Sequence, residues 1–274
     1  MHGFQTRRPS DEHAHEHVVT FDIETIVDEE PADGSFPPWP RHKPVAAAFL
    51  TAAAWNGHAE FRLDTLACEP GREADFYREV DRLLPTGCTI VSFNGRAFDA
   101  PVLRLSAMAA GVFDAGNIAR LAQANRYGRE HADLCELFGS YGAARGHPLS
   151  SLCERLQIPV KTSVSGSDVG ALWRAGDREA VLRYVSEDVL ATYVLWLHHI
   201  AFRHADPSLL AEPLAALARW LQTSPELAHL LPFADCAPAR AAHPAALAFA
   251  VRRALEKAER RLERARTDRE FEPL

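Results

Sequence analysis

The sequence VVTFDIET, residues Val18–Thr25, predicts a buried β-strand that carries two carboxylates. Side chains alternate between the two faces of a strand, so Asp22 and Glu24 share one face, about 7 Å apart, and apolar residues occupy the other. Two buried like charges are costly without a cation. Carboxylate oxygens are the ligands that Mg²⁺ and Mn²⁺ prefer. This stretch therefore predicts a metal-binding strand, and by itself it leaves open a solvated edge strand.

The composition of the chain indicates a globular protein that does not coat nucleic acid. Of 274 residues 47% are hydrophobic, the formal net charge is −7 and the pI is about 6.0, so any nucleic-acid contact should be local. The five cysteines include no Cys-x-x-Cys pair, which predicts free thiols in a reducing compartment. The chain has no signal-peptide pattern and no long apolar run. We expect a soluble, cytoplasmic protein with no membrane partner.

The hydrophobic pattern predicts a mixed α/β fold. Strands are predicted at 18–25, 45–55, 59–63, 88–93 and 131–137, and helices at 72–84, 99–110, 149–156, 167–174 and 177–203. Asn56-Gly57 is a hairpin signal, and the Pro-rich segment Asp28–Pro44 is predicted to be irregular. Three antiparallel strands continued by parallel ones, with helices packing on the sheet, describe a ribonuclease-H-like mixed sheet followed by an all-helical C-terminal extension.

The domain organisation follows from the same patterns. Residues 1–17 form a polar tail, 18–205 the α/β domain and 206–274 the helical C-terminal extension. Residues 246–270 contain eight Lys or Arg and five acidic side chains over a helical apolar spacing. Both a solvated amphipathic helix and a nucleic-acid or partner contact fit that pattern.

Two further segments carry polar groups suited to chemistry. Asp99, which follows a predicted strand and precedes Pro101, is either a helix N-cap or a metal ligand at the end of a strand. Asn94, on the same turn, can bind a nucleotide or shape the turn. Tyr184 and Asp188 are four residues apart on a predicted helix, so a phenol and a carboxylate face the same site or form a surface hydrogen bond.

Together these segments resemble a known family of enzymes. Phe21–Thr25, the Asn-Gly-x-x-Phe-Asp pattern within Phe93–Pro101, and Tyr184-x-x-x-Asp188 resemble, in order and spacing, the motifs of the DEDD-type 3′-5′ exonucleases. The likeness is greatest to the proofreading domain of B-family DNA polymerases and its free-standing bacterial relatives, and it covers about residues 18–200. His131–Phe138 also resembles the family's strand before the third motif.

The resemblance implies a site and a mechanism. Asp22, Glu24, Asp99 and Asp188 would hold two divalent cations, Mg²⁺ or Mn²⁺, at the scissile phosphodiester. Tyr184 would orient the attacking water, and nucleoside 5′-monophosphates would be released from a 3′ end. The other branch of the family has a His five residues before the last Asp. Because that position holds an arginine here, the resemblance points to the tyrosine branch, DEDDy.

The expected partner is nucleic acid, with 3′ ends of single-stranded DNA favoured and RNA possible. Asn94 and Phe98 are the candidates for holding the terminal nucleotide, and Arg96, Arg104 and Lys161 are possible phosphate contacts. The alternatives are an exoribonuclease that trims RNA 3′ ends and a catalytically silent domain that binds nucleic acid or a partner protein. The distinguishing contact to a 2′-hydroxyl cannot be assigned to any residue.

Overall fold

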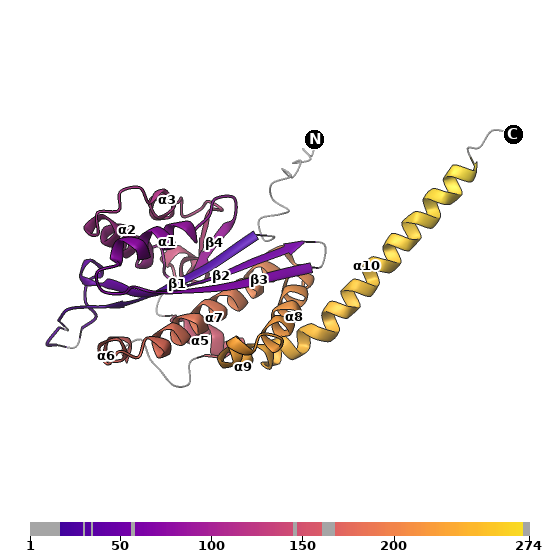
Figure 1. The fold of residues 1–274 in the computed structure, drawn as a ribbon. Coiled ribbons are helices and arrows are strands. Elements are labelled where there is room, and N and C mark those ends of the chain that lie inside the picture. Colours follow the sequence, from indigo (N-terminus) through magenta and orange to yellow (C-terminus); the bar gives the residue numbers. More distant parts are fainter. Residues whose placement is uncertain are drawn as a thin grey trace.

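The computed structural model describes residues 17–29, 31–33, 35–55, 58–144, 147–160 and 168–270 (Figure 1). The strands are β1 His17–Ile26, β2 Lys43–Trp55, β3 His58–Ala67, β4 Thr89–Ser92 and β5 His131–Asp133. The α-helices are α1 Glu73–Arg82, α2 Asp99–Ala109, α3 Gly116–Gln123, α4 Leu134–Phe138, α5 Leu149–Arg155, α6 Val169–Arg174, α7 Arg178–His204, α8 Ser208–Gln222, α9 Leu231–Ala234 and α10 Ala237–Glu270. Short 3₁₀ helices are η2 Trp39–Arg41, η3 Ser140–Gly142 and η5 Pro225–Leu230.

The strands form one mixed sheet in the order β3-β2-β1-β4-β5. β1 pairs antiparallel with β2, and β2 with β3, whereas β4 runs parallel to β1 and β5 parallel to β4. The prediction of a ribonuclease-H-like mixed sheet with an all-helical C-terminal region is therefore confirmed. β1 is the central strand of this sheet, and helices cover both of its faces, which accounts for its apolar character.

Helices cover both faces of the sheet, and the alternation of β1 divides its side chains between them (Figure 1). Val19, Phe21 and Ile23 belong to the core cluster that includes buried residues of α1, α2 and α3. Val18 belongs to the opposite cluster, built around α7 and α8. Because Asp22 and Glu24 have the same parity as Val18, they face the α7 side, as the strand pattern predicts.

The long helix α7 is buried along most of its length. The Asp177 carboxylate accepts a hydrogen bond from the Ala180 amide (3.1 Å) and caps its first turn. Ala205, in the left-handed region with φ 51°, ends it. α8, α9 and the first turns of α10 continue the same core as far as Ala242. The remainder of α10 extends away from the body of the molecule (Figure 1).

Several predicted elements differ from the structure. The predicted strand at 131–137 is wrong after Asp133, because the Asp133 carboxylate accepts hydrogen bonds from the Cys135 and Glu136 amides and starts α4. α3 was not predicted. Within Asp28–Pro44, predicted to be irregular, η2 forms and β2 begins at Lys43.

Some predictions concern residues that the structure does not describe. β1 begins at His17, so only residues 1–16 of the predicted polar tail lie outside the described residues. The hairpin signal Asn56-Gly57 and the possible phosphate contact Lys161 also lie outside them. Among the described residues, none of the helices combines the length and the apolar character needed to cross a membrane. All five cysteines are free.

Candidate active site

β1 supplies two carboxylates at the point where its pairing with β2 changes. Asp22 and Glu24 are partly exposed, and the register with β2 shifts between Glu24 and Thr25. Such irregularities bend a strand and redirect its side chains, and they recur beside active sites. Asp22 and Glu24 therefore lie at an open end of an otherwise buried strand.

α7 brings a third carboxylate to the same place. One ligand atom from each of Asp22, Glu24 and Asp188 lies within 4.8 Å of the other two. Asp188 is partly exposed, whereas its neighbour one turn earlier, Tyr184, is only 4% exposed. We call the three residues the carboxylate cluster. They lie up to 166 residues apart in the chain, and they meet because α7 packs against the face of β1 that carries the acids.

The Tyr184 phenol lies beside the carboxylate cluster and remains protonated. Burial first, and then the negative charges of Glu24, Asp188 and Asp22, raise the pKa of Tyr184 well above its ordinary value. A protonated phenol donates a hydrogen bond and does not act as a base at neutral pH. The site therefore combines three carboxylate acceptors with one hydrogen-bond donor, the Tyr184 phenol.

Asp99 lies behind the carboxylate cluster and is 4% exposed. Its interpretation as an N-cap is wrong: it is the first residue of α2, and the residue before the helix is Phe98, which makes no capping hydrogen bond. The pKa of Asp99 is raised to about 7, and burial is the main cause. Backbone hydrogen bonds, first that of Asp99 itself, partly offset this rise, and the negative charges of Asp133 and Asp188 add to it. Asp99 is thus within electrostatic reach of Asp188, but it is not among the three described residues whose ligand atoms converge.

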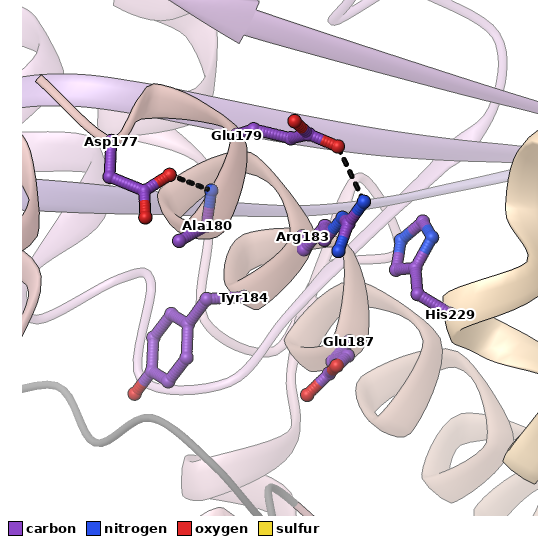
Figure 2. Close-up of a pocket in the computed structure, with 7 residues that line it drawn as sticks. All are labelled: Asp177, Glu179, Ala180, Arg183, Tyr184, Glu187 and His229. Atoms are coloured by element: carbon purple, nitrogen blue, oxygen red, sulfur yellow. Dashed lines mark hydrogen bonds and ion pairs between the residues drawn. The ribbon is translucent and has the colours of Figure 1, made fainter.

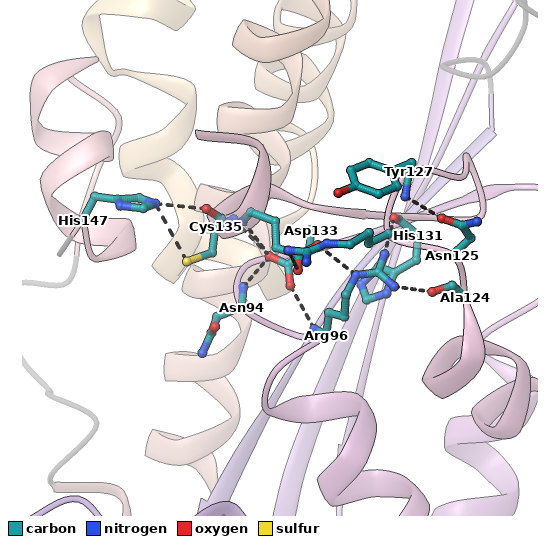
Figure 3. Close-up of polar contacts among 11 residues, drawn as sticks. Asn94, Arg96, Ala124, Asn125, Tyr127, His131, Asp133, Cys135 and His147 are labelled. Carbon is teal, nitrogen blue, oxygen red and sulfur yellow. Dashed lines mark hydrogen bonds and ion pairs between the residues drawn. The ribbon is translucent and has the colours of Figure 1, made fainter. Parts of the chain in front are cut away.

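The turn between β4 and α2 is held by a residue that the sequence analysis did not select. The Asp133 carboxylate accepts hydrogen bonds from the amides of Asn94 and Arg96, both at 2.9 Å, besides capping α4 (Figure 3). Asn94 has φ 63°, a left-handed conformation that asparagine tolerates. Next to it a Cβ on Gly95 would lie 2.4 Å from the Ser92 hydroxyl, so only glycine fits. The capping-box pattern Asp133-x-x-Glu136 was the available signal.

Arg96 is a structural residue and not a surface charge. Its side chain is 17% exposed, pairs with Glu136 at 3.0 Å and donates to the carbonyl oxygens of His131 (2.9 Å) and Ala124 (Figure 3). These bonds join the β4–α2 turn to the segment before β5. The possible phosphate contact at Arg96 is therefore not supported.

Phe98 and Asn94 do not line the cleft into which Asp22 faces, although their neighbour Phe93 does. The Phe98 ring packs edge-on against His42 (centroids 4.8 Å apart) and near Phe36 (5.7 Å), which is 74% exposed. His42 in turn is hydrogen-bonded to the Thr25 hydroxyl at 2.8 Å. Phe98 thus belongs to an aromatic cluster that ties the loop after β1 to the start of α2.

A cleft of about 950 Å³ opens over the carboxylate cluster. Asp22, Tyr184 and Asp188 line it on one side, and Phe93 also reaches it. The C-terminal helices form part of its wall, which the sequence analysis did not anticipate. These wall residues are His229, Pro232, Phe233, Cys236 and Ala237.

A smaller pocket of about 430 Å³ adjoins the cleft along α7 and shares Tyr184, Glu187 and His229 with it. Figure 2 shows Arg183, which pairs with Glu179, pointing toward His229, while Tyr184 points to the other side of the helix. Burial, and then the charge of Arg183, lower the pKa of His229. His229 is therefore a neutral side chain at the junction of the two cavities.

Comparison with known proteins assigns the chain to a family. Residues 34–236, well over half of the chain, match the family described as predicted 3′-5′ exonucleases related to the exonuclease domain of PolB. The chain belongs to this family. The match includes Asp99, Tyr184 and Asp188, and it begins after Asp22 and Glu24. The expected resemblance to the DEDD-type 3′-5′ exonucleases is thus confirmed at the level of the family.

Two solved structures are also similar to this chain. One, titled "The structure of exonuclease I suggests how processivity is achieved", is 14% identical, with a TM-score of 0.38, and the match covers 77% of this chain and 42% of that one. The other, E. coli exonuclease I in complex with a dT13 oligonucleotide, is 14% identical, with a TM-score of 0.39, over 70% and 43% of the two chains. The chain thus spans less than half the length of these proteins. No curated protein matches the sequence.

The oxygen atoms of the carboxylate cluster suit a divalent metal ion. Asp22, Glu24 and Asp188 offer only carboxylate oxygens, which hard cations prefer, and the atoms are close enough to share one ion. Their negative charges repel one another and, after burial, raise the pKa of Tyr184, so a bound cation would relieve both effects. The carboxylate cluster could therefore hold a metal ion.

Proposed function

We propose that this protein is a 3′-5′ exonuclease that hydrolyses phosphodiester bonds at the 3′ ends of single-stranded DNA and releases nucleoside 5′-monophosphates. The observation that carries the proposal is the convergence of Asp22, Glu24 and Asp188 from β1 and α7, at a cleft that Asp22, Asp188 and Tyr184 line. The proposal includes two divalent cations, Mg²⁺ or Mn²⁺. A bound pair of such ions lowers the pKa of water and neutralises the charge that develops on the phosphate and the leaving oxygen.

The carboxylates divide the task of holding the ions. Asp22, Glu24 and Asp188 are the residues that would share the first ion, because their oxygens already converge. Asp99 is the candidate for completing the second position, since its carboxyl is close enough for the charge of Asp188 to raise its pKa. Positive charge at the cluster would reverse that effect and favour the ionised form of Asp99.

Tyr184 would orient the nucleophile. Its protonated phenol can donate a hydrogen bond to the water that attacks phosphorus and fix the direction of that attack. This role supports assignment to the tyrosine branch. Arg183, at the position of the other branch's histidine, is 56% exposed, and its side chain pairs with Glu179.

The cleft wall supports a single strand as substrate. Pro232, Phe233 and Ala237 contribute apolar surface to the same cleft as Asp22 and Asp188. Unstacked bases bury their faces against such surface, whereas duplex bases are already stacked. We extend the proposal to Asn94, exposed on its turn, and Phe98 as contacts to the terminal nucleotide.

The test is a cleavage assay on 5′-labelled DNA and RNA single strands of matched sequence, with Mg²⁺, Mn²⁺ or chelator. Wild type should give a metal-dependent ladder that shortens from the 3′ end of DNA, and Asp188→Asn should not. Asp75→Asn, an exposed acid on α1, is the matched control and should behave as wild type. A ladder on RNA alone would replace the proposed substrate, and cleavage of neither strand would favour a silent binding domain.

A further inference from the structure

Another pocket, of about 700 Å³, lies at the start of β5, and we call it the β5-edge pocket. One wall is the segment from Arg126 to His131, and the other is the C-terminal part of α7 and the turn into α8. Within the described chain it shares no lining residue with the cleft over the carboxylate cluster. Arg203 follows Asp188 by four turns of α7, about 22 Å at 1.5 Å per residue. The pocket is therefore separate from the candidate active site.

Two exposed tyrosines form an aromatic platform at the pocket. Tyr127 is 71% exposed and Tyr141 40%, and their ring centroids are 4.9 Å apart. The Arg126 guanidinium lies 5.8 Å and 5.5 Å from the two centroids and pairs with Glu136 at 2.7 Å. The rings are thus held by a fixed cation while much of their surface faces solvent. Aromatic faces of this kind stack planar bases.

The backbone that presents Tyr141 is in an unfavourable conformation. Ser140 (φ 48°) and Tyr141 (φ 55°) are consecutive non-glycine residues in the left-handed region. This conformation is unfavourable for such residues and persists where the surroundings impose it. Here the Ala144 amide donates to the Gly139 carbonyl oxygen at 2.9 Å and closes the turn around them. The position of the tyrosine ring is thus imposed by the fold.

The floor of the pocket contains two buried polar side chains with an unused hydrogen-bonding atom. His131 is 1% exposed and Trp196 6% exposed, and neither His131 Nδ1 nor Trp196 Nε1 has a partner among the described residues. Burial lowers the pKa of His131 to about 3, so the ring is neutral. An unmade hydrogen bond of a buried group is costly, and the indole is only a donor. A ligand with acceptor atoms at the floor fits this need.

Charged groups of both signs line the pocket: the guanidinium groups of Arg126, Arg129 and Arg203, and the carboxylates of Asp133, Glu136 and Asp206. The carboxylates of Glu136 and Asp206 already accept hydrogen bonds, from Arg126 and Arg96 and from Ser208, respectively. Arg203 is exposed on the last turn of α7 and pairs with no carboxylate in the part of the chain that is described. Its guanidinium can therefore meet a phosphate that enters the pocket.

We propose that the β5-edge pocket binds a nucleotide, with the base against Tyr127 and Tyr141 and the phosphate toward Arg203. A volume of about 700 Å³ accommodates a ligand of that size. A free nucleoside monophosphate and one nucleotide of a single strand present the same chemistry. The site does not depend on the proposed catalytic function, because no residue of the carboxylate cluster contributes to it.

Titration calorimetry on the full chain in chelator tests the proposal, with AMP, adenosine, inorganic phosphate and a short oligothymidylate as probes. AMP should bind once per chain, and Tyr127→Ala/Tyr141→Ala should weaken it about tenfold or more. Both tyrosines are exposed, so thermal melting should show the variant folded. Arg203→Ala should weaken AMP but not adenosine. Arg78→Ala, an exposed arginine of α1, and Asp188→Asn should bind AMP as wild type does.

The outcomes separate the sources and the alternatives. Binding of AMP that the tyrosine variant weakens supports a free-nucleotide site, and binding of oligothymidylate alone with the same sensitivity supports a strand-binding site. The proposal is wrong if neither probe binds, if the tyrosine variant binds both unchanged, or if Asp188→Asn abolishes binding. Phosphate binding as tightly as AMP would also overturn it, because the platform would then contribute nothing.

Discussion

The two longest helices, α7 and α10, have opposite relations to solvent. α7 has 27 residues, of which 15 are buried, and it packs between the sheet and α8. α10 has 34 residues, but after Ala242 its described side chains are half-buried or exposed. Both segments favour a helix locally, so the difference shows that packing, not helical propensity, decides which helix can position catalytic groups.

The exposed part of α10 also has apolar side chains, and no part of the chain that the structure describes covers them. Leu247, Val251, Leu255 and Leu262 are 51–67% exposed along one side of the helix. One ion pair, Arg253 with Glu212 of α8, links this part to the body. By contrast, Tyr184 and Asp188 project from a helix whose other sides are fixed. A rigid support of this kind is what a metal site requires.

The largest expected effect is on the rate of cleavage, and it should distinguish an acidic residue of α7 from one of α10. Asp188→Asn should lower the rate of nucleic-acid cleavage by about 10²-fold or more, because it removes a carboxylate on which the metal site depends. Glu256→Gln, on the exposed part of α10, should leave the rate unchanged. The single-turnover rate in Mn²⁺ measures both, and equal losses would contradict the contrast between the helices.

Truncation of a leucine should separate the helices in stability. Leu190→Ala on α7 should lower the free energy of unfolding by about 2–5 kcal/mol, because Leu190 is fully buried and leaves a cavity. Leu255→Ala on α10 should change it by less than about 0.5 kcal/mol, since that side chain is 60% exposed. Urea denaturation measures both values. A large effect at Leu255 would indicate an unrecognised interface on α10.

Metal binding should stabilise the region of α7 through the carboxylate cluster. At 100 times its dissociation constant, Mn²⁺ should add about 2.7 kcal/mol to the free energy of unfolding and raise the melting temperature. The Asp188→Asn variant should show little of this increase. Differential scanning fluorimetry with Mn²⁺ or chelator makes the comparison, and a melting temperature that ignores Mn²⁺ in wild type would count against the site.

Acid should act on the buried histidine next to α7. The folded protein keeps His131 neutral down to a pKa of about 3, whereas the unfolded chain takes up the proton near 6.5. The unfolded state therefore binds more protons between these values, and stability falls as pH falls, by up to about 1.4 kcal/mol per pH unit. Asp99, with its raised pKa, makes the free energy of unfolding change with pH in the opposite direction. The test therefore compares the free energies of unfolding of wild type and His131→Asn at each pH.

Urea denaturation at several pH values between 6.5 and 4 gives that difference. Stability of wild type should decrease relative to that of His131→Asn as the pH is lowered. Parallel curves for the two proteins would mean that His131 is protonated in the folded state.

The smallest effect is expected from removing the exposed part of α10. A chain that ends after Ala246 should melt within about 2 °C of the full chain, because the residues removed bury little apolar surface. A chain that ends before η5 should not fold, since Leu230, Phe233 and Ala239 are part of the core around α7. Thermal melts by circular dichroism compare the three chains.

The sequence predicted which site residues share a face of one strand or helix, but it did not predict the roles of Asp99 and Asp133 at the ends of their helices. Asp22 and Glu24 share a face because strand alternation is a local property, and Tyr184 and Asp188 share a face for the same reason on a helix. Asp99 as an N-cap was wrong, because whether a carboxylate caps its helix depends on where that helix begins. Asp133 was missed although its capping-box spacing was visible, because the strand pattern was extended across it.

The sequence by itself determined the mixed sheet, the central acidic strand, the long helix and the family motifs, because hydrophobic periodicity, turn residues and motif spacing are local properties of the sequence. Only the tertiary structure decided that Asp22, Glu24 and Asp188 meet within 4.8 Å and that Phe233 and its neighbours form a wall of the cleft. It also decided that Tyr127 and Tyr141 form the aromatic platform at the β5-edge pocket. These contacts join residues far apart in the chain. Their formation depends on how α7 packs between the sheet and the C-terminal helices, which no local pattern encodes.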